Sequence, residues 1–311
     1  MIGWVGLKLL RAAFTMWLVV TFVFFVLRLT GDPVAQLLPD DIGPEAVEFY
    51  RAKWGLDRSI WEQYFSYWAA LFEGDFGISF RNNQPAFEMV WERTGKTALL
   101  GLTALGFALA LGLPMGVIAA TNRDGWVDRS VMSLAVFGFS MPNFFLGILL
   151  ILIFSLQLRV LPSSGSDTWL HLVMPAFTLG TAFAAQIARF TRSAMIDVLN
   201  KPYMRTAASK GAGPARRVSA HAAPNAAVPI VTIVGLKIGE LIGGAVITET
   251  VFAWPGVGRL LTVAVANRDL AVVQCILMLI ALTMVTANVV TDLMYGWLDP
   301  RVRVGQGART R

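Results

Sequence analysis

The stretch that decides the fold runs from Thr97 to Ala120, TALLGLTALGFALALGLPMGVIAA, and contains no charged residue. Because a helix rises about 1.5 Å per residue, a run of this length crosses the ~30 Å hydrocarbon core of a bilayer. The composition of the whole chain agrees with this: 56% of its 311 residues are hydrophobic and 15% are charged, whereas soluble chains carry about 25% charged residues. We therefore expect an all-α, polytopic membrane protein.

Other apolar runs of spanning length bring the expected number of transmembrane helices to about six. They are Ala12–Leu27, Ser130–Leu158, Leu172–Ala188, about Ala226–Phe252, and Ala271–Thr291. The first run resembles a signal peptide in position, but no small-residue cleavage motif follows it, so we expect a retained helix. The run Ser130–Leu158 is longer than a span requires and contains Met141-Pro142-Asn143. A tilted or broken helix is therefore expected there.

The distribution of charge predicts the orientation. With the N-terminus inside, the inner segments hold fifteen basic residues against four acidic ones, and basic loops stay on the cytoplasmic side. Both termini are therefore expected in the cytoplasm, and the net charge of +6 needs no nucleic acid partner. We expect an N-terminal helix (1–29), an external segment (30–96), a five-helix core (97–298) with a cytoplasmic coupling loop (189–226), and a cytoplasmic tail (299–311).

The external segment, residues 30–96, is expected to fold into a small cap. Its eleven acidic and six basic residues are mixed as on a wet surface, and long loops cross the membrane largely regardless of charge. It is also rich in aromatic side chains, which favour the membrane interface. These are Trp54, Trp61, Tyr64, Phe65, Tyr67 and Trp68.

The sequence contains no pattern typical of an enzyme. A phosphate-binding loop of the form Gly-x4-Gly-Lys-Ser/Thr is absent, as are a His-Glu-x-x-His helix and a Ser/His/Asp constellation. His171 and His221 lack ligand spacing, and the single cysteine, Cys275, lies in an apolar run. We therefore expect no catalytic residue, no metal site and no cofactor bound by this chain. Any energy for transport must come from a partner.

The inner loop between the fourth and fifth apolar runs is the most informative segment. Residues Tyr203 to Lys210 are rich in small side chains and are followed by the helix stop Gly211-Ala-Gly213-Pro214. A short protruding helix of this kind suits docking into a groove of a partner. The alternative is an ordinary basic loop held near anionic lipid.

This loop also carries a family resemblance. Nine residues separate Gly211 from His221-Ala-Ala-Pro224, and Arg205-Thr206-Ala207 precedes the glycine. The pattern resembles the E-A-A-x3-G-x9-I-x-L-P loop of permease subunits in binding-protein-dependent ABC importers, except that the acid is absent. The local form is similar to the dipeptide, oligopeptide and nickel branch. The same resemblance extends to Gly31-Asp32-Pro33, Gly74–Ser79, Ser140–Phe144, Glu249–Arg259, Asn267-Arg-Asp269 and Leu298-Asp-Pro-Arg301.

The resemblance implies a coupling helix that docks into a cleft of a separate ATPase. The implied coupling residues are Tyr203, Arg205, Thr206, Ala207, Ala208, Lys210, Gly211 and Pro224. It also implies a second homologous permease subunit, two ATPase subunits that carry ATP and Mg, and an extracytoplasmic substrate-binding protein. The implied function is import of peptides across the inner membrane by alternating access, with nickel chelates or glutathione-like peptides as alternative substrates.

Polar residues within the apolar runs are candidates for the transport pathway. Lys237 and Glu240 lie three apart, so a helix would place them on one face. Charges at this depth are costly, so the two either line the pathway or neutralise each other as a structural pair. Glu249 and Asn143 are candidates for an outer gate. A rival class, a secondary transporter or channel, would need internal inverted repeats and would leave the loop signature unexplained.

Overall fold

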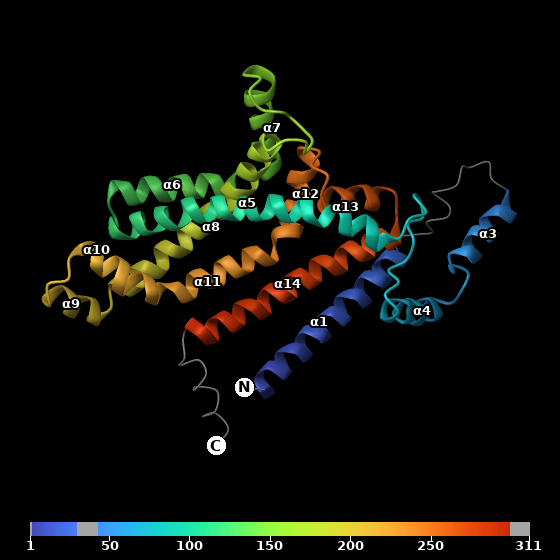
Figure 1. Cartoon of the computed structure of the whole chain (residues 1–311), viewed down its shortest axis with the longest axis horizontal. Coiled ribbons are helices and arrows are strands. Elements are labelled where there is room, and N and C mark those ends of the chain that lie inside the picture. The colour runs from blue at the N-terminus through green and yellow to red at the C-terminus, as the bar shows by residue number, and fades with distance from the viewer. Residues whose placement is uncertain (1, 30–42, 299–311) are drawn as a thin grey trace. The chain divides into compact units, whose positions relative to one another are not determined.

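A computed structural model of the chain describes residues 2–29 and 43–298, and within these ranges every regular element is a helix (Figure 1). The bounds are α1 Ile2–Leu29, α3 Pro44–Lys53, α4 Ile60–Phe72, α5 Ala86–Thr121, α6 Trp126–Ser140, α7 Asn143–Leu150, the π-helix η1 Ile151–Gln157, α8 Leu170–Leu199, α9 Pro202–Ser209, α10 Pro214–Arg216, the π-helix η2 Arg217–Ala222, α11 Ala223–Gly239, α12 Leu241–Val251, α13 Val257–Ala266 and α14 Leu270–Leu298. The expected all-α class is confirmed.

Five helical stretches are long and apolar enough to cross a membrane, and a bent pair can supply a sixth. The five are Gly6–Leu29, Ala86–Thr121, Leu170–Leu199, Pro214–Gly239 and Leu270–Asp292. This confirms the expected number of spans. Two parts of the expected organisation, residues 30–42 with Gly31-Asp32-Pro33 and the tail 299–311, lie outside the described residues.

The bent pair is the run in which a broken helix was expected. Helix α6 ends at Ser140, and the segment Asn143–Gln157 continues at 95° to it. Met141, which precedes Pro142, has φ −78° and ψ 119°. A residue before proline is pushed out of the helical region, because the proline ring clashes with its backbone. The break is therefore a direct consequence of the Met-Pro-Asn sequence.

The fifth apolar run differs from the expectation of one helix over Ala226–Phe252. Helix α11 ends at Gly239 and α12 begins at Leu241, so the chain is interrupted at Glu240. Glycine has a low helix propensity, and the carboxylate of Glu240 turns to the ammonium of Lys237, with 2.5 Å between the oxygen and the nitrogen. The interruption therefore occurs at the charged pair.

The loop expected on the cytoplasmic side begins later than predicted, because α8 continues to Leu199 instead of ending near Ala188. Arg192, in this added length, makes two hydrogen bonds of 2.6 Å to the buried carboxylate of Asp128 on α6. A bidentate pair of this kind fixes orientation as well as position. The pair holds the extended end of α8 against α6.

The chain divides into two compact units. The first contains residues 1–97 with 255–282, and the second contains 98–254 with 283–311. The domain boundaries expected at residues 29, 96 and 298 remain predictions. Helix α5 runs without a break across residue 96.

In the first unit, α1 and α4 pack through aromatic rings. Phe24 is fully buried, and its ring centroid lies 5.4 Å from that of Tyr64 in an edge-to-face arrangement. The hydroxyl groups of Thr21 and Tyr64 are 2.8 Å apart. Asp269, just before α14, accepts a hydrogen bond from the hydroxyl of Ser79. The aromatic and hydroxyl contacts thus join α1 to α4, and the Ser79–Asp269 bond joins the stretch after α4 to the residues just before α14.

In the second unit, α5, α6 and α11 each pack against α8 (Figure 1). The buried core includes Leu100 and Ala104 from α5 and Leu179 and Ile187 from α8. A methyl group added at Gly116 of α5 would lie 2.6 Å from the carbonyl oxygen of Ala188, so the two backbones approach closely. Close approach through small residues is the usual way in which membrane helices pack.

Candidate functional site

The strongest candidate site is α9, the short helix at the far end of α8 and α11 (Figure 1). Lys201 before it is extended and Pro202 is its first residue, a position where the missing N–H of proline costs nothing. The helix ends at Ser209, and Gly211, two residues later, has φ +82°. The N–H groups of Gly211 and Ala212 donate to the carbonyl oxygens of Ala208 and Ala207, at 2.9 and 3.0 Å. This is the Schellman end that the glycine predicts.

A single side chain anchors α9 to the rest of the second unit. Of the eight residues of α9, all within the described part of the chain, only Met204 is buried. It packs in a cluster with Met195 and Val198 of α8 and with Ala222 and Ala226. Burial of one such side chain is worth about 1.5–3 kcal/mol. The orientation of α9 therefore depends largely on Met204.

The rest of α9 presents its side chains to the outside. Tyr203 is 44% exposed, and the side chains of Arg205, Thr206, Ala208 and Lys210 are exposed as well. Ala207 is half-buried and contributes its carbonyl oxygen to the helix end.

Pro224 lies apart from α9, exposed in the first turn of α11. The predicted coupling residues therefore fall into two places: most lie on α9 and its glycine end, and one begins the next long helix.

The surface around α9 is strongly basic. Between Asp197 and Glu240 the sequence contains no acidic residue, while Arg205, Lys210 and Arg216 are exposed. A cavity of about 440 Å³ lies behind α9 and is lined by Met204, Arg205, Ala208 and Arg217, among others. The Nε of Arg217 is buried without a hydrogen-bond partner among the described residues. The site is therefore a convex helix beside a basic hollow, suited to an acidic protein surface.

The candidate pathway residues form one direct pair. The side chain of Lys237 is 5% exposed, whereas that of Glu240 is 46% exposed, and their charged atoms are 2.5 Å apart. The ammonium of Lys237 also lies 5.2 Å from the centroid of the Phe183 ring on α8, a cation–π distance. The lysine is therefore buried among the packed helices, whereas the carboxylate of the glutamate is exposed at the break between α11 and α12.

Asn143 and Glu249 lie on two helices that pack together. Asn143 begins α7 and is half-buried, whereas Glu249 on α12 is fully buried. A methyl group added at Gly147 of α7 would lie 3.1 Å from the side chains of Val251 and Phe252. The bend after α6 therefore brings the helix of Asn143 against the helix of Glu249.

Comparison with known proteins identifies the family. The family model described as "Binding-protein-dependent transport system inner membrane component" matches residues 112–304, more than half of the chain. The chain belongs to this family. It is a multi-pass permease of the inner-membrane, ABC-importer type.

Full-length relatives agree with this assignment. The chain is 40% identical over 304 residues to the glutathione transport system permease protein GsiC of Escherichia coli strain K12, covering 97% of this chain and 99% of the relative. The GsiC of Shigella flexneri serotype 5b is 39% identical with the same coverage. These relatives are transport permease subunits and not enzymes.

A solved structure shows the same fold. The inward-facing MetNI methionine ABC transporter aligns with a TM-score of 0.57 at 18% identity, covering 68% of this chain and 96% of that chain. At this identity the likeness concerns the fold alone. Membership of the permease family removes the secondary transporter or channel as a rival class.

Sequence reasoning singled out residues of α9 and its glycine end, most of which are exposed, but missed two contacts that position this region. Met204 was not singled out, although it is the one long apolar side chain between Tyr203 and Arg205. The pair between Asp128 and Arg192 was also missed, because these residues are far apart in the chain and neither belongs to a recognisable sequence motif. Both contacts depend on which helices become neighbours.

Proposed function

We propose that this chain forms one half of the path of an ABC importer for peptides. The 40% identity to a glutathione transport permease along nearly the whole chain supports a peptide-like substrate. Glutathione-like peptides and dipeptides or oligopeptides are the first candidates, and nickel chelates are the alternative. In the proposed cycle a substrate-binding protein delivers the substrate. The path through the importer then opens alternately to the two sides of the membrane.

The observation that carries the coupling part of the proposal is the construction of α9. Its ends are fixed by Pro202 and Gly211, one residue anchors it, and its other side chains, apart from the half-buried Ala207, are exposed beside a basic hollow. A helix that packed only for stability would bury more than one residue. We infer that α9 docks into a groove of a separate ATPase and transmits closure of the ATPase dimer to α8 and α11.

The remaining partners follow from the same proposal. A second, homologous permease subunit completes the path, and two ATPase subunits bind ATP and Mg, so this chain holds no cofactor. Both termini lie in the cytoplasm, which places α9 on the cytoplasmic side with the ATPases. The segment with α3 and α4 then faces the substrate-binding protein.

The charged pair at the α11–α12 break is proposed to lie along the pathway. Lys237 is buried but Glu240 is 46% exposed on its side chain, so the carboxylate is accessible to a charged substrate end. A purely structural pair remains the alternative. Replacement of both residues by Lys237→Met with Glu240→Gln removes the charges together and avoids leaving one buried charge alone. Unchanged peptide uptake by this double variant would refute the pathway role.

A charge reversal on α9 tests the coupling proposal directly. Arg205→Glu reverses one charge on the exposed face of α9, and Arg129→Glu makes the same change at an exposed position in the first turn of α6. We expect Arg205→Glu to abolish co-purification of the ATPase subunits and substrate-stimulated ATP hydrolysis. Arg129→Glu should retain both. Equal behaviour of the two variants would remove α9 as the docking element.

The substrate is tested separately with the assembled importer and its own binding protein in proteoliposomes. We expect ATP-dependent uptake of radiolabelled glutathione or a dipeptide and no uptake of a nickel chelate. Uptake of the nickel chelate alone would overturn the peptide assignment without affecting the coupling role of α9.

A further inference from the structure

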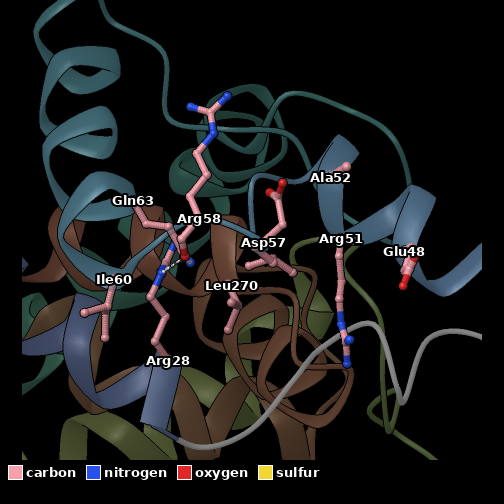
Figure 2. A pocket seen from close by; sticks show the side chains of 10 residues that line it. Arg28, Glu48, Arg51, Ala52, Asp57, Arg58, Ile60, Gln63 and Leu270 are labelled. Atoms are coloured by element: carbon pink, nitrogen blue, oxygen red, sulfur yellow. Dashed lines mark hydrogen bonds between the residues drawn. The ribbon is translucent and has the colours of Figure 1, made fainter.

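A charged cavity of about 810 Å³ lies in the first unit, where α1, α3 and α4 meet (Figure 2). Three arginines line it, Arg28, Arg51 and Arg58, together with two carboxylates, Glu48 and Asp57. Among the described residues the lining therefore holds one more cationic than anionic side chain. Neither the family assignment nor the proposed coupling mechanism gives this cavity a role.

Arg28 is held in one orientation with part of its guanidinium unpaired. Its Nε donates to the Oε1 of Gln63 at 2.8 Å, and its guanidinium carbon lies 3.8 Å from the centroid of the buried Phe24 ring. Gln63 is fixed in turn, because its Nε2 donates to the carbonyl oxygen of Arg58 at 2.9 Å. The Nη1 of Arg28 is buried and has no hydrogen-bond partner among the described residues. A buried donor without an acceptor is costly, and an anionic oxygen would satisfy it.

The position of Arg28 along the chain indicates the depth of the cavity in the membrane. Arg28 lies in the last turn of the span Gly6–Leu29, so its guanidinium reaches the boundary between hydrocarbon and water. Helix α4, which packs on this end of α1, exposes 60% of Trp61 and 66% of Phe65. Exposed aromatic rings of this kind collect at the level of lipid headgroups. The cavity therefore lies where lipid phosphates lie.

The cavity wall is apolar as well as basic. Leu56, Ile60 and Leu270 line it beside the arginines. A free phosphate ion would gain nothing from these side chains, whereas the glycerol and first methylene groups of a phospholipid would be buried against them. Basic pockets beside membrane helices bind lipid headgroups in this way.

We propose that this cavity binds the phosphate of a phospholipid headgroup, with Arg28 as the central donor and Gln63 as the residue that positions it. The bound lipid would tie the end of α1 to α3 and α4.

The test uses the full-length permease in its purified complex and native mass spectrometry to count bound short-chain lipid. The probes are dihexanoyl-phosphatidylglycerol, dihexanoylglycerol (which lacks the phosphate) and inorganic phosphate. We expect one copy of the phospholipid to bind at a concentration where neither of the other probes binds or displaces it. Equal binding of dihexanoylglycerol would overturn the role of the phosphate, and displacement by the same concentration of inorganic phosphate would overturn the role of the lipid.

Two variants assign the binding to this cavity. Arg28→Gln removes the guanidinium, and Gln63→Glu places a carboxylate next to Arg28, where it competes with the phosphate. Loss of one charged hydrogen bond predicts affinity weaker by about tenfold or more in each case. Arg81→Gln is the control. Arg81 belongs to the same unit, but it donates a hydrogen bond to Asn267 and does not line the cavity. Gln63→Glu keeps the test valid if Arg28→Gln fails to fold. Unchanged binding in Gln63→Glu would overturn the proposal.

Discussion

Helices α4 and α9 are both short helices outside the predicted spans, yet they are held in opposite ways. Helix α4 begins with a capping box, in which the Ser59 hydroxyl accepts from the N–H of Glu62 and the Glu62 carboxylate accepts from the N–H of Ser59. Its Tyr64 then packs among the rings of α1. Helix α9 begins at a proline, ends at a glycine and buries Met204 alone.

The difference is the one expected between a structural helix and the docking helix proposed for α9. Many contacts make α4 part of the packed first unit, so its loss should unfold neighbouring structure. A single anchor leaves the surface of α9 free for a partner, so most of its side chains should matter for coupling and little for stability.

The largest contrast is expected between two tyrosines. Tyr64→Ala removes a side chain that is 8% exposed and touches Phe24, Phe25 and Thr21, and it should lower the free energy of unfolding by about 3–5 kcal/mol. Tyr203→Ala on α9 removes a side chain that is 44% exposed and should leave stability nearly unchanged while reducing substrate-stimulated ATP hydrolysis. Thermal unfolding monitored by size-exclusion chromatography checks the first effect, and an ATPase assay checks the second. Similar melting temperatures for the two variants would contradict the contrast.

The anchor of α9 should have a smaller, local effect. Met204→Ala removes its one buried side chain, at a cost of about 2 kcal/mol, because a site near the surface can partly collapse. We expect hydrogen exchange of the α9 amides to become about 30-fold faster, with α4 unchanged as the internal control. Faster exchange throughout the second unit would show that Met204 supports more than α9.

The glycine end of α9 gives a matched pair of substitutions. An added methyl group meets nothing within 4 Å at either Gly211 or Gly213, but only Gly211 has a positive φ, +82°. Gly211→Ala should therefore weaken the end of α9 by about 1 kcal/mol through backbone strain alone, whereas Gly213→Ala should be nearly neutral. Hydrogen exchange at the Ala212 amide measures the difference. An equal effect of both changes would rule out backbone strain as the cause.

The smallest effect concerns the capping box of α4. Hydrogen bonds from the backbone and the hydroxyl of Ser59 lower the pKa of Glu62 from its usual value of 4.5. Because the folded pKa lies below the unfolded one, this stabilisation is present above pH 4.5 and is lost as the pH falls through the folded pKa. Glu62→Gln keeps a side-chain acceptor without the charge. The free energy of unfolding of this variant should therefore not decrease in this way as the pH falls. Parallel acid unfolding curves for the two proteins would contradict the role of the carboxylate.

Much of the fold could be read from local pattern. Uncharged runs such as Thr97–Ala120 predict spans because the bilayer offers unpaired backbone groups no water. The Met-Pro-Asn break after α6 and the glycine end of α9 follow from steric rules that act within a few residues. The interruption at Glu240 was not predicted, because hydropathy averages over the charged pair and does not detect a helix end.

By itself the sequence determined the helical class, the number of spans and the position of the short helix α9, since each depends on neighbours along the chain. Only the tertiary structure decided that Met204 anchors α9, that Arg192 meets Asp128, and that Arg28 faces a basic cavity with a donor that has no partner among the described residues. These contacts join residues distant in sequence. They arise from the packing of whole helices, in which close-packed side chains select one arrangement that no local pattern encodes.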